Sequence, residues 1–238
     1  DAAADKMKVR LVAPRLLEGH AQPVRSVAVS PNGQLAATAS ADNTVRVWNL
    51  GNAQTAVTLT GHTAAVQAVA WSADGARLVT GSADKTVRLW NAADGKQLAQ
   101  LDGHAAEVRS VAFRPDGAQV LSGAADGAVK QWNTADNKEV RTLAGPAGPV
   151  VGVAFLAGGA QLAAAAADGK MFVFDAASGA AVRTIEHGGP VTAVVASSDG
   201  SLLASAGADN AVKLWKAADG AAAGAIASDP EPRLSRSA

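Results

Sequence analysis

Apolar and polar residues alternate in short runs along the chain, and turns rich in Asp, Asn and Gly separate the runs. The segment 61–104 shows the plan best, with four runs over 66–71, 77–80, 86–90 and 97–101. A period of two over five or six residues predicts strands, and no segment sustains the period of 3.6 that a helix needs. Each such segment therefore predicts an antiparallel meander of four short strands.

The plan repeats along the chain. Asp84 precedes Trp90 by six residues, and the same interval separates four more pairs: Asp42 and Trp48, Asp126 and Trp132, Asp168 and Phe174, and Asp209 and Trp215. A repeat of about 42 residues is typical of propellers and solenoids. Each predicted sheet carries apolar side chains on both faces, and stacking the sheets radially buries both. The pattern predicts a propeller with one blade per unit.

The combination of Gly61-His62, Asp84 and Trp90 resembles the WD40 repeat signature. It recurs at Gly19-His20 with Asp42 and Trp48, and at Gly103-His104 with Asp126 and Trp132. The resemblance implies an all-β, WD40-type β-propeller with five four-stranded antiparallel blades.

In this family a His, a Ser or Thr, the turn Asp and the Trp form a buried hydrogen-bonded tetrad. The resemblance maps complete tetrads onto His20, Ser40, Asp42, Trp48 and onto His62, Ser82, Asp84, Trp90, and partial ones onto His104, Asp126, Trp132 and onto His187, Asp209, Trp215. Ala124 and Gly207 stand at the expected hydroxyl position of the third and fifth units. The fourth unit has Pro146, Ala166 and Phe174, which leaves Asp168 without partners, so we expect this blade to be the softest or the most altered by a contact.

The composition leaves little for catalysis. The chain has four His, and each precedes a turn Asp by 22 residues, so none remains for a metal site or a general base. Most carboxylates lie in predicted turns, and no nucleophile elbow, phosphate-binding loop or His-Glu-x-x-His motif is present. With no Cys, thiolate metal sites and disulfides are excluded. We expect no enzyme activity and no catalytic, cofactor-binding or metal site.

Charge and hydropathy narrow the partners and the compartment. Lys and Arg number 21, as do Asp and Glu, so no net field favours nucleic acid or an anionic membrane. No apolar run approaches the roughly 18–20 residues that span a bilayer. The start, DAAADKMKVR, has no signal-peptide core, which favours the cytoplasm, although it also lacks an initiator Met. The abundance of Ala and Gly points to a bacterial source.

The resemblance also implies where a partner binds. WD40 partners commonly dock on the loop face around the central opening, and the equivalent positions there are Arg25, Gln67, Arg109, Val151 and Thr192. Arginines suit acidic or backbone groups of a peptide, although Arg25 and Arg109 could equally decorate the rim. The resulting expectation is a non-catalytic protein–protein interaction scaffold. The alternative is an accessory or substrate-binding propeller of a larger enzyme or redox protein.

The number of units raises a question of closure. We divide the chain into an N-terminal segment 1–19, a five-repeat domain 20–227 and a polar tail 228–238. Val9–Leu17 reads as a fourth strand, yet the last unit has its own before residue 227. Three readings are open: a piece of a longer array, a five-bladed ring with one strand displaced, or an arc that other chains complete.

Overall fold

The computed structural model describes residues 16–227, which form five four-stranded sheets. We number these sheets as blades one to five in chain order. Blade one contains β1 (Val24–Val29), β2 (Leu35–Ser40), β3 (Val45–Asn49) and β4 (Gln54–Leu59). Blade two contains β5 (Val66–Trp71), β6 (Arg77–Ser82), β7 (Val87–Asn91) and β8 (Gln97–Leu101). Blade three contains β9 (Val108–Phe113), β10 (Gln119–Ala124), β11 (Val129–Asn133) and β12 (Glu139–Leu143).

The last two blades follow the same order. Blade four contains β13 (Val150–Leu156), the 3₁₀ turn η1 (Ala157–Gly159), β14 (Gln161–Ala166), β15 (Lys170–Asp175) and β16 (Ala181–Glu186). Blade five contains β17 (Val191–Ala196), β18 (Leu202–Gly207), β19 (Ala211–Lys216) and β20 (Ala222–Ala227). All pairings are antiparallel between consecutive strands, so the predicted all-β fold with five four-stranded meanders is confirmed.

Short turns set the register of each meander. In blade two the β5–β6 turn is held by Ser72, whose hydroxyl accepts from the Arg77 backbone N–H at 2.9 Å, and by Asp74, which accepts from the Ala76 N–H at 3.0 Å. Lys85, in the β6–β7 turn, has a φ of 71°. Side chains that satisfy turn amides locally explain why Asp, Ser and Asn recur at these positions.

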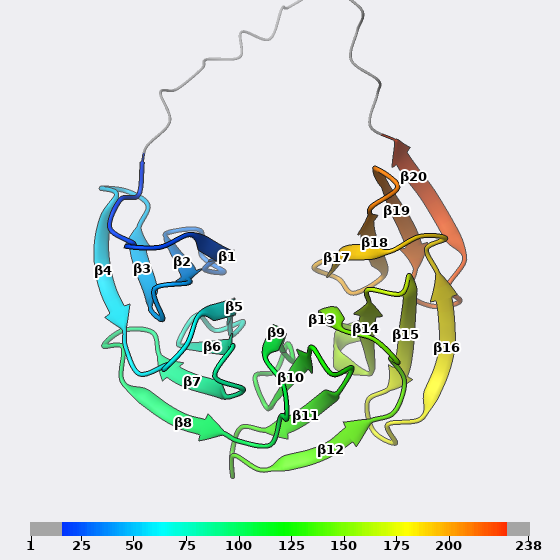
Figure 1. Cartoon of the computed structure of the whole chain (residues 1–238), viewed down its shortest axis with the longest axis horizontal. Helices are drawn as coiled ribbons and strands as arrows, with labels where there is room; N and C mark the ends of the chain where they lie inside the picture. Colours follow the sequence, from blue (N-terminus) through cyan, green and yellow to red (C-terminus); the bar gives the residue numbers. More distant parts are fainter. Residues whose placement is uncertain (1–15, 228–238) are drawn as a thin grey trace, which may run out of the picture.

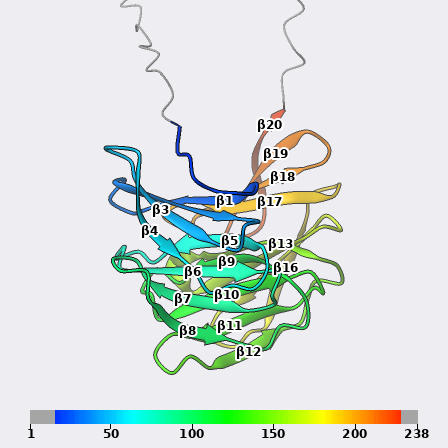
Figure 2. The ribbon, with the colours of Figure 1, turned by 60° about the vertical axis from the view of Figure 1, so that its left-hand side comes forward.

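The blades stand side by side in an open arc (Figure 1). The first strand of each blade lines the inside, where β1 packs against β5, β5 against β9, β9 against β13 and β13 against β17. Figures 1 and 2 both place blade three on the side away from the opening. β17 and β1 face the opening from opposite ends, and β20 fills the fourth position of blade five. The described residues therefore do not form a closed five-bladed ring.

The core lies between blades as well as within them. Val66 and Val69 of blade two join one apolar cluster with Ala37, Val45 and Leu59 of blade one. Three similar clusters bridge the other neighbouring blades. Because blades two to four each have a neighbour on both faces, their apolar residues contribute to two interfaces.

Two predictions fall at the ends of the chain. The fourth strand expected over Val9–Leu17 lies mostly outside the described residues, and Leu16 and Leu17 belong to no strand. The tail 228–238 also lies outside them. The domain boundaries stay a prediction. Within residues 16–227, no helix has the length and apolar character needed to cross a membrane.

Candidate functional site

A chain of buried hydrogen bonds links the turn of blade two to its tryptophan. The Trp90 indole N–H donates to Thr80 Oγ1 at 2.9 Å, and Thr80 Oγ1 lies 2.7 Å from His62 Nε2. His62 Nδ1 lies 2.8 Å from Asp84 Oδ2. A neutral imidazole with its proton on Nδ1 satisfies all of these groups, because it donates to the carboxylate and accepts from the hydroxyl.

The pKa values of Asp84 and His62 in this hydrogen-bond network fit a structural role. Burial alone would raise the pKa of Asp84, but hydrogen bonds from Thr86, His62 and backbone amides lower it to about 2. Burial lowers the pKa of His62, against the opposing effect of Asp84. The pair is thus an ionised carboxylate and a neutral imidazole at pH 7, which suits neither a general acid nor an exposed nucleophile.

Gly61 is required where the chain enters the blade. Its φ is 152°, and a Cβ there would lie 3.2 Å from the Trp90 ring and 2.8 Å from Arg88 Nη1. The backbone therefore passes directly over the indole edge, which only glycine permits. This close approach explains the Gly-His pair that the sequence repeats.

The hydroxyl in the tetrad differs from the expected one. Thr80 bridges His62 and Trp90, whereas the predicted Ser82 donates to the backbone carbonyls of Ala64 and Ala65. Blade one repeats this arrangement: Thr38 bridges His20 and Trp48, and Ser40 donates to the Gln22 carbonyl. The assignment of Ser40 and Ser82 to the tetrads is therefore corrected to Thr38 and Thr80. The reason is strand geometry: residues two apart share a face, and only the earlier one lies beside the tryptophan paired across the strands.

A second feature is a hollow of about 380 Å³ at the starts of the inner strands. It is lined by Arg25, Gln67, Glu107, Arg109, Val151 and Thr192. All five residues that the sequence placed at equivalent loop-face positions thus meet in one depression. Glu107 also lines the hollow and was not predicted from the sequence; it stands two residues before Arg109.

The polar groups of this hollow differ in their partners. Arg109 Nε donates to Glu107 Oε1 at 2.6 Å, and the two side chains form an ion pair. Thr192 donates to the Ala206 carbonyl at 3.2 Å. Within the described residues Arg25 is exposed and makes no hydrogen bond or ion pair. One arginine is therefore held in place and the other is free to meet a ligand.

The family comparison accords with this geometry. The model of the family described as WD domain, G-beta repeat matches residues 13–49, 53–91, 95–133, 137–175 and 179–216. These segments cover most of the chain. The chain belongs to the WD40 repeat family. No curated protein matches the chain.

WD40 repeats and blades are offset from one another in this chain. The matched segment 53–91 begins with β4, which is the fourth strand of blade one, and ends with β7 of blade two. Each of the four later WD40 repeats therefore spans two neighbouring sheets and ties them together covalently, whereas the described part of the first match holds only β1 to β3 of blade one. Domains of this family are typically binding scaffolds and are usually non-catalytic.

The WD40 tetrad of blade three is interrupted. Ser122 bridges His104 Nε2 and the Trp132 indole, both at 2.7 Å, so the hydroxyl expected to be missing is present two residues before Ala124. Among the described residues, however, the buried His104 Nδ1 has no partner, and Asp126 accepts only from the Ala128 N–H. Burial, aided by the charge of Lys130, lowers the pKa of His104 to about 4.

Blade five keeps its tetrad by turning the imidazole over. His187 Nδ1 lies 2.8 Å from Ser205 Oγ, and its Nε2 lies 3.1 Å from Asp209 Oδ1. Ser205 also accepts from the Trp215 indole at 2.7 Å. Gly207 makes room for this ring, since a Cβ there would lie 2.2 Å from His187 Nε2. The expectation that Gly207 marks a missing hydroxyl is therefore wrong, because Ser205 supplies it.

Blade four replaces the tetrad with apolar packing. Phe174 is fully buried in the tryptophan position and stacks on Phe172, with ring centroids 6.4 Å apart. Gly145 lies over this pair as Gly61 lies over Trp90. Within residues 16–227, Asp168 accepts only from the Lys170 N–H in its own turn. Blade four has thus lost the polar partners of the tetrad and, with Phe174 in place of Trp, also the indole N–H that needed one.

The histidines of the described residues all take part in these networks. All four His side chains bond to groups of their own blade. Three third-strand cations are paired: Arg88 with Asp84 at 3.7 Å, Lys130 with Glu139 at 2.7 Å and Lys213 with Asp209 at 2.9 Å. Arg46 instead lies over the Trp48 ring, and its Nε has no hydrogen-bond partner among the described residues. Within residues 16–227 no three His, Asp or Glu side chains gather as metal ligands would.

Proposed function

We propose that this protein is a non-catalytic scaffold that binds an acidic peptide segment of a partner protein in the hollow lined by Arg25, Gln67, Glu107, Arg109, Val151 and Thr192. The observation that carries the proposal is the convergence of one residue from each of the five blades on a single depression. Because the hollow takes residues from all five blades, it exists only when the whole arc is folded, and binding there depends on the fold.

The charges favour a carboxylate-bearing ligand. The exposed Arg25 guanidinium has no partner among residues 16–227, and it can form a bidentate pair with a carboxylate. Arg109 is oriented by Glu107 and keeps further N–H donors for a peptide carbonyl or carboxylate. Gln67 and Thr192 add neutral polar groups, and Val151 adds an apolar wall. This combination suits an extended peptide better than a small apolar ligand.

The test is selection of peptides from a random 12-residue library on the immobilised chain. We expect enrichment of peptides that contain Asp or Glu, with affinity falling as salt rises. Combining Arg25→Ala with Arg109→Ala should weaken their binding at least about tenfold, because two charge-assisted contacts are lost. The unfolding midpoint should hardly move, since both side chains are exposed.

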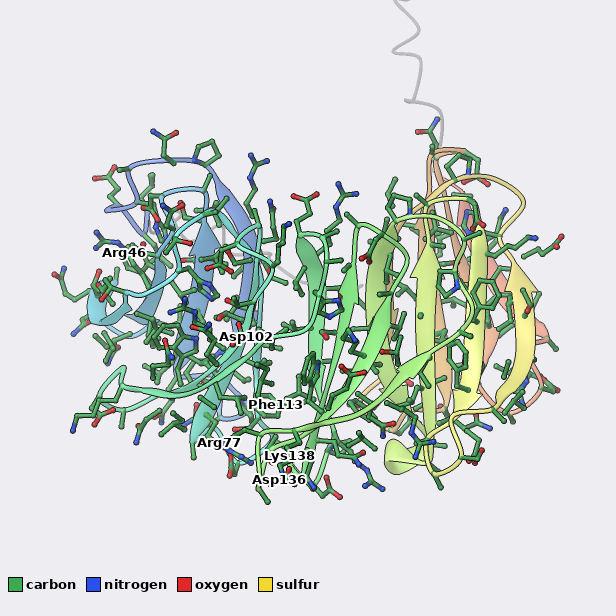
Figure 3. All side chains as sticks on the ribbon, turned by 60° about the horizontal axis from the view of Figure 1, so that its bottom comes forward. Arg46, Arg77, Asp102, Phe113, Asp136 and Lys138 are labelled. Carbon is green, nitrogen blue, oxygen red and sulfur yellow. The ribbon has the colours of Figure 1, made fainter. Side chains whose placement is uncertain are left out.

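Lys138→Ala is the matched control. Lys138 lies near Asp136 at one end of the blades, and Arg46 lies toward the other end (Figure 3). Arg46 marks the Gly-His end, because a Cβ added at Gly19 would lie 2.8 Å from its Nη1. This variant removes a positive charge without touching the hollow, so peptide binding should be unchanged. If selected peptides bind the double arginine variant as well as the parent, or if none is enriched, the proposed site is wrong.

A further inference from the structure

A second hollow, of about 360 Å³, lies between blades three and four, at the other end of the first strands from the proposed peptide site. Arg114, which lines it, follows the last residue of β9, whereas Arg109 is the second residue of that strand. Figure 3 shows Phe113, the residue before Arg114, toward the same end of the blades as Lys138. The polar lining consists of Arg114, Gln119, Arg141 and Asp175, and the rest of the wall is glycine and alanine. The two hollows share no residue.

Arg114 departs from the pattern of the repeat. It stands where three other blades have the serine that holds the turn between the first two strands: Ser30, Ser72 and Ser197. The Arg114 side chain reaches blade four instead, where a Cβ added at Gly159 would lie 2.7 Å from its Nε. Among residues 16–227 this side chain makes no hydrogen bond, and its ion pair with the exposed Asp116 is long, at 3.5 Å. Its N–H donors are therefore largely unused by the fold.

Gln131 of β11 is a second departure, inside the core. The equivalent residues of the other blades are aliphatic: Val47, Leu89, Val173 and Leu214. Gln131 is fully buried, and its Nε2 donates to Gln119 Oε1 at 2.7 Å and to the Ala176 carbonyl at 3.2 Å. Its Oε1 has no partner among the described residues. A buried acceptor without a donor destabilises the fold, and an aliphatic side chain at this position avoids that cost.

The orientation of Gln131 determines that of Gln119. Because the Ala176 carbonyl can only accept, the end of the Gln131 amide that faces it is the nitrogen. That nitrogen requires the oxygen of the Gln119 amide, so the Gln119 N–H2 group points away from Gln131. Gln119 lines the hollow, and this N–H2 group has no partner within the described part of the chain. The buried glutamine thus holds a donor at the wall of the hollow.

Arg141 and Asp175 complete the polar lining. Arg141 Nη2 donates to the Ala177 carbonyl at 2.7 Å, and a Cβ added at Gly179 would lie 2.7 Å from Arg141 Cδ, so blade four holds this arginine in place. Asp175 Oδ1 accepts from the hydroxyl and the N–H of Ser178, both at 2.7 Å. These bonds, together with the charge of Arg141, lower the pKa of Asp175, which is ionised at pH 7. Two arginines and one aspartate leave the hollow with a single excess positive charge.

These groups select a monoanion that also carries an N–H group. Two guanidinium groups and the Gln119 N–H2 suit a carboxylate, and the second oxygen of Asp175, unpaired among residues 16–227, suits an N–H donor. A phosphate dianion would exceed the excess charge and would lie beside the Asp175 carboxylate. The end of a peptide chain presents a carboxylate and an N–H within one residue, and it needs room for the chain on one side only.

We propose that this hollow binds the free C-terminal carboxylate of a peptide chain. Arg114, Gln119 and Arg141 receive the carboxylate, and Asp175 accepts the last backbone N–H. The volume lies in the range of about 300–1,000 Å³ that is usual for ligand pockets. The inference does not depend on the proposed function, because the hollow of Arg25 and Arg109 contributes no residue to it.

The test uses fluorescein-labelled hexapeptides with a free C-terminus and random last residues, selected on the immobilised chain. Selected peptides are then titrated by fluorescence anisotropy as free acids and as C-terminal amides. Amidation should weaken binding at least about tenfold, because it removes the charge that the arginines receive. Combining Arg25→Ala with Arg109→Ala should leave this binding unchanged, which separates it from binding in the other hollow.

Two variants return blade three to the residues of its sister blades. Arg114→Ser restores the turn serine, so the unfolding midpoint should stay or rise while affinity falls at least about tenfold. Gln131→Leu restores an aliphatic core residue, so the midpoint should rise while affinity falls, because Gln119 loses its anchor. Arg183→Gln is the matched control. Arg183 is the equivalent of Arg141 at the next junction, where it donates to the Ala217 carbonyl, and its loss should leave peptide affinity unchanged.

Four results would overturn the inference: no peptide is selected, acids and amides bind equally, inorganic phosphate displaces the peptides as well as acetyl-alanine does, or Arg114→Ser weakens binding no more than Arg183→Gln. A fall in both the midpoint and the affinity for Gln131→Leu would show that this glutamine serves packing, and it would remove the positioning role assigned to it.

Discussion

Blades two and three are neighbours with the same Gly-His and Trp frame, yet only blade two completes its hydrogen-bond chain. In blade two Asp84 reaches His62 at 2.8 Å, and Thr86 donates to the same carboxylate at 2.7 Å. In blade three Ala128 replaces that threonine, and no group in the described part of the chain hydrogen-bonds to His104 Nδ1. The two sheets nevertheless have the same strand order and nearly the same register.

The difference separates what builds a blade from what reinforces it. Trp90 and Trp132 are both 1% exposed, and the apolar residues around them are equally buried. Burial of this surface is therefore sufficient for the sheet to form. The carboxylate end of the tetrad adds stability on top of that packing, in proportion to the buried donors that it satisfies.

The largest loss of stability should come from removing the hydroxyl that bridges His and Trp, which both blades have. Thr80→Val removes the oxygen that serves both His62 and Trp90, and it should cost about 2–4 kcal/mol, because two buried polar groups lose a partner. Ser122→Ala in blade three should cost a similar amount. Urea unfolding measures both, with the exposed Thr58→Val as a control expected to be nearly silent. A loss below about 0.5 kcal/mol for Thr80→Val would contradict the bridging role.

The next effect should distinguish the blades. Asp84→Ala should cost about 1–3 kcal/mol, since it leaves His62 and Thr86 unsatisfied, whereas Asp126→Ala should cost less than about 0.5 kcal/mol. Ionised Asp84 has a folded pKa of about 2, below the unfolded value of about 3.9. Its contribution is therefore complete above pH 4 and declines as the pH falls toward 2. Equal losses for the two variants at pH 7 would contradict the comparison.

A pH effect should reveal the unpartnered imidazole of blade three. The folded pKa of His104 is about 4, below the unfolded value of about 6.5, so the unfolded chain binds more protons between these values. Stability should therefore fall as the pH drops, by about 2 kcal/mol from this residue between pH 7 and 5. Unfolding free energies of the parent and of His104→Gln across that range test this. The variant should show a shallower slope, and parallel slopes would exclude His104 as a source.

The smallest effect should come from rebuilding the missing part. Ala128→Thr restores a hydroxyl that can donate to Asp126, as Thr86 does to Asp84, and should add about 0.5–1 kcal/mol. The gain should vanish in the presence of Asp126→Ala, because the hydroxyl then has no carboxylate to meet. A gain that persists in the double variant would point to strand propensity rather than the hydrogen bond.

The sequence by itself determined the repeat, the four-strand meander and the position of most tetrad members. These features depend on local spacing, because the alternation of side chains and the turn residues repeat at fixed intervals whatever the surroundings. The same spacing gave Arg25, Gln67, Arg109, Val151 and Thr192 equivalent places in successive blades, and these residues line one hollow. That they bind a partner stays a prediction.

Only the tertiary structure decided which hydroxyl reaches the tryptophan, how His187 is oriented and where the arc ends. Ser82 and Thr80 share one face of β6, and the contact with Trp90 across the strands selects between them. The turned imidazole of His187 depends on space at Gly207. The exposure of Val27 and Val212 depends on whether another blade packs against them. The repeated sequence is the same at a buried junction and at an open end, so it does not show which of the two a valine occupies.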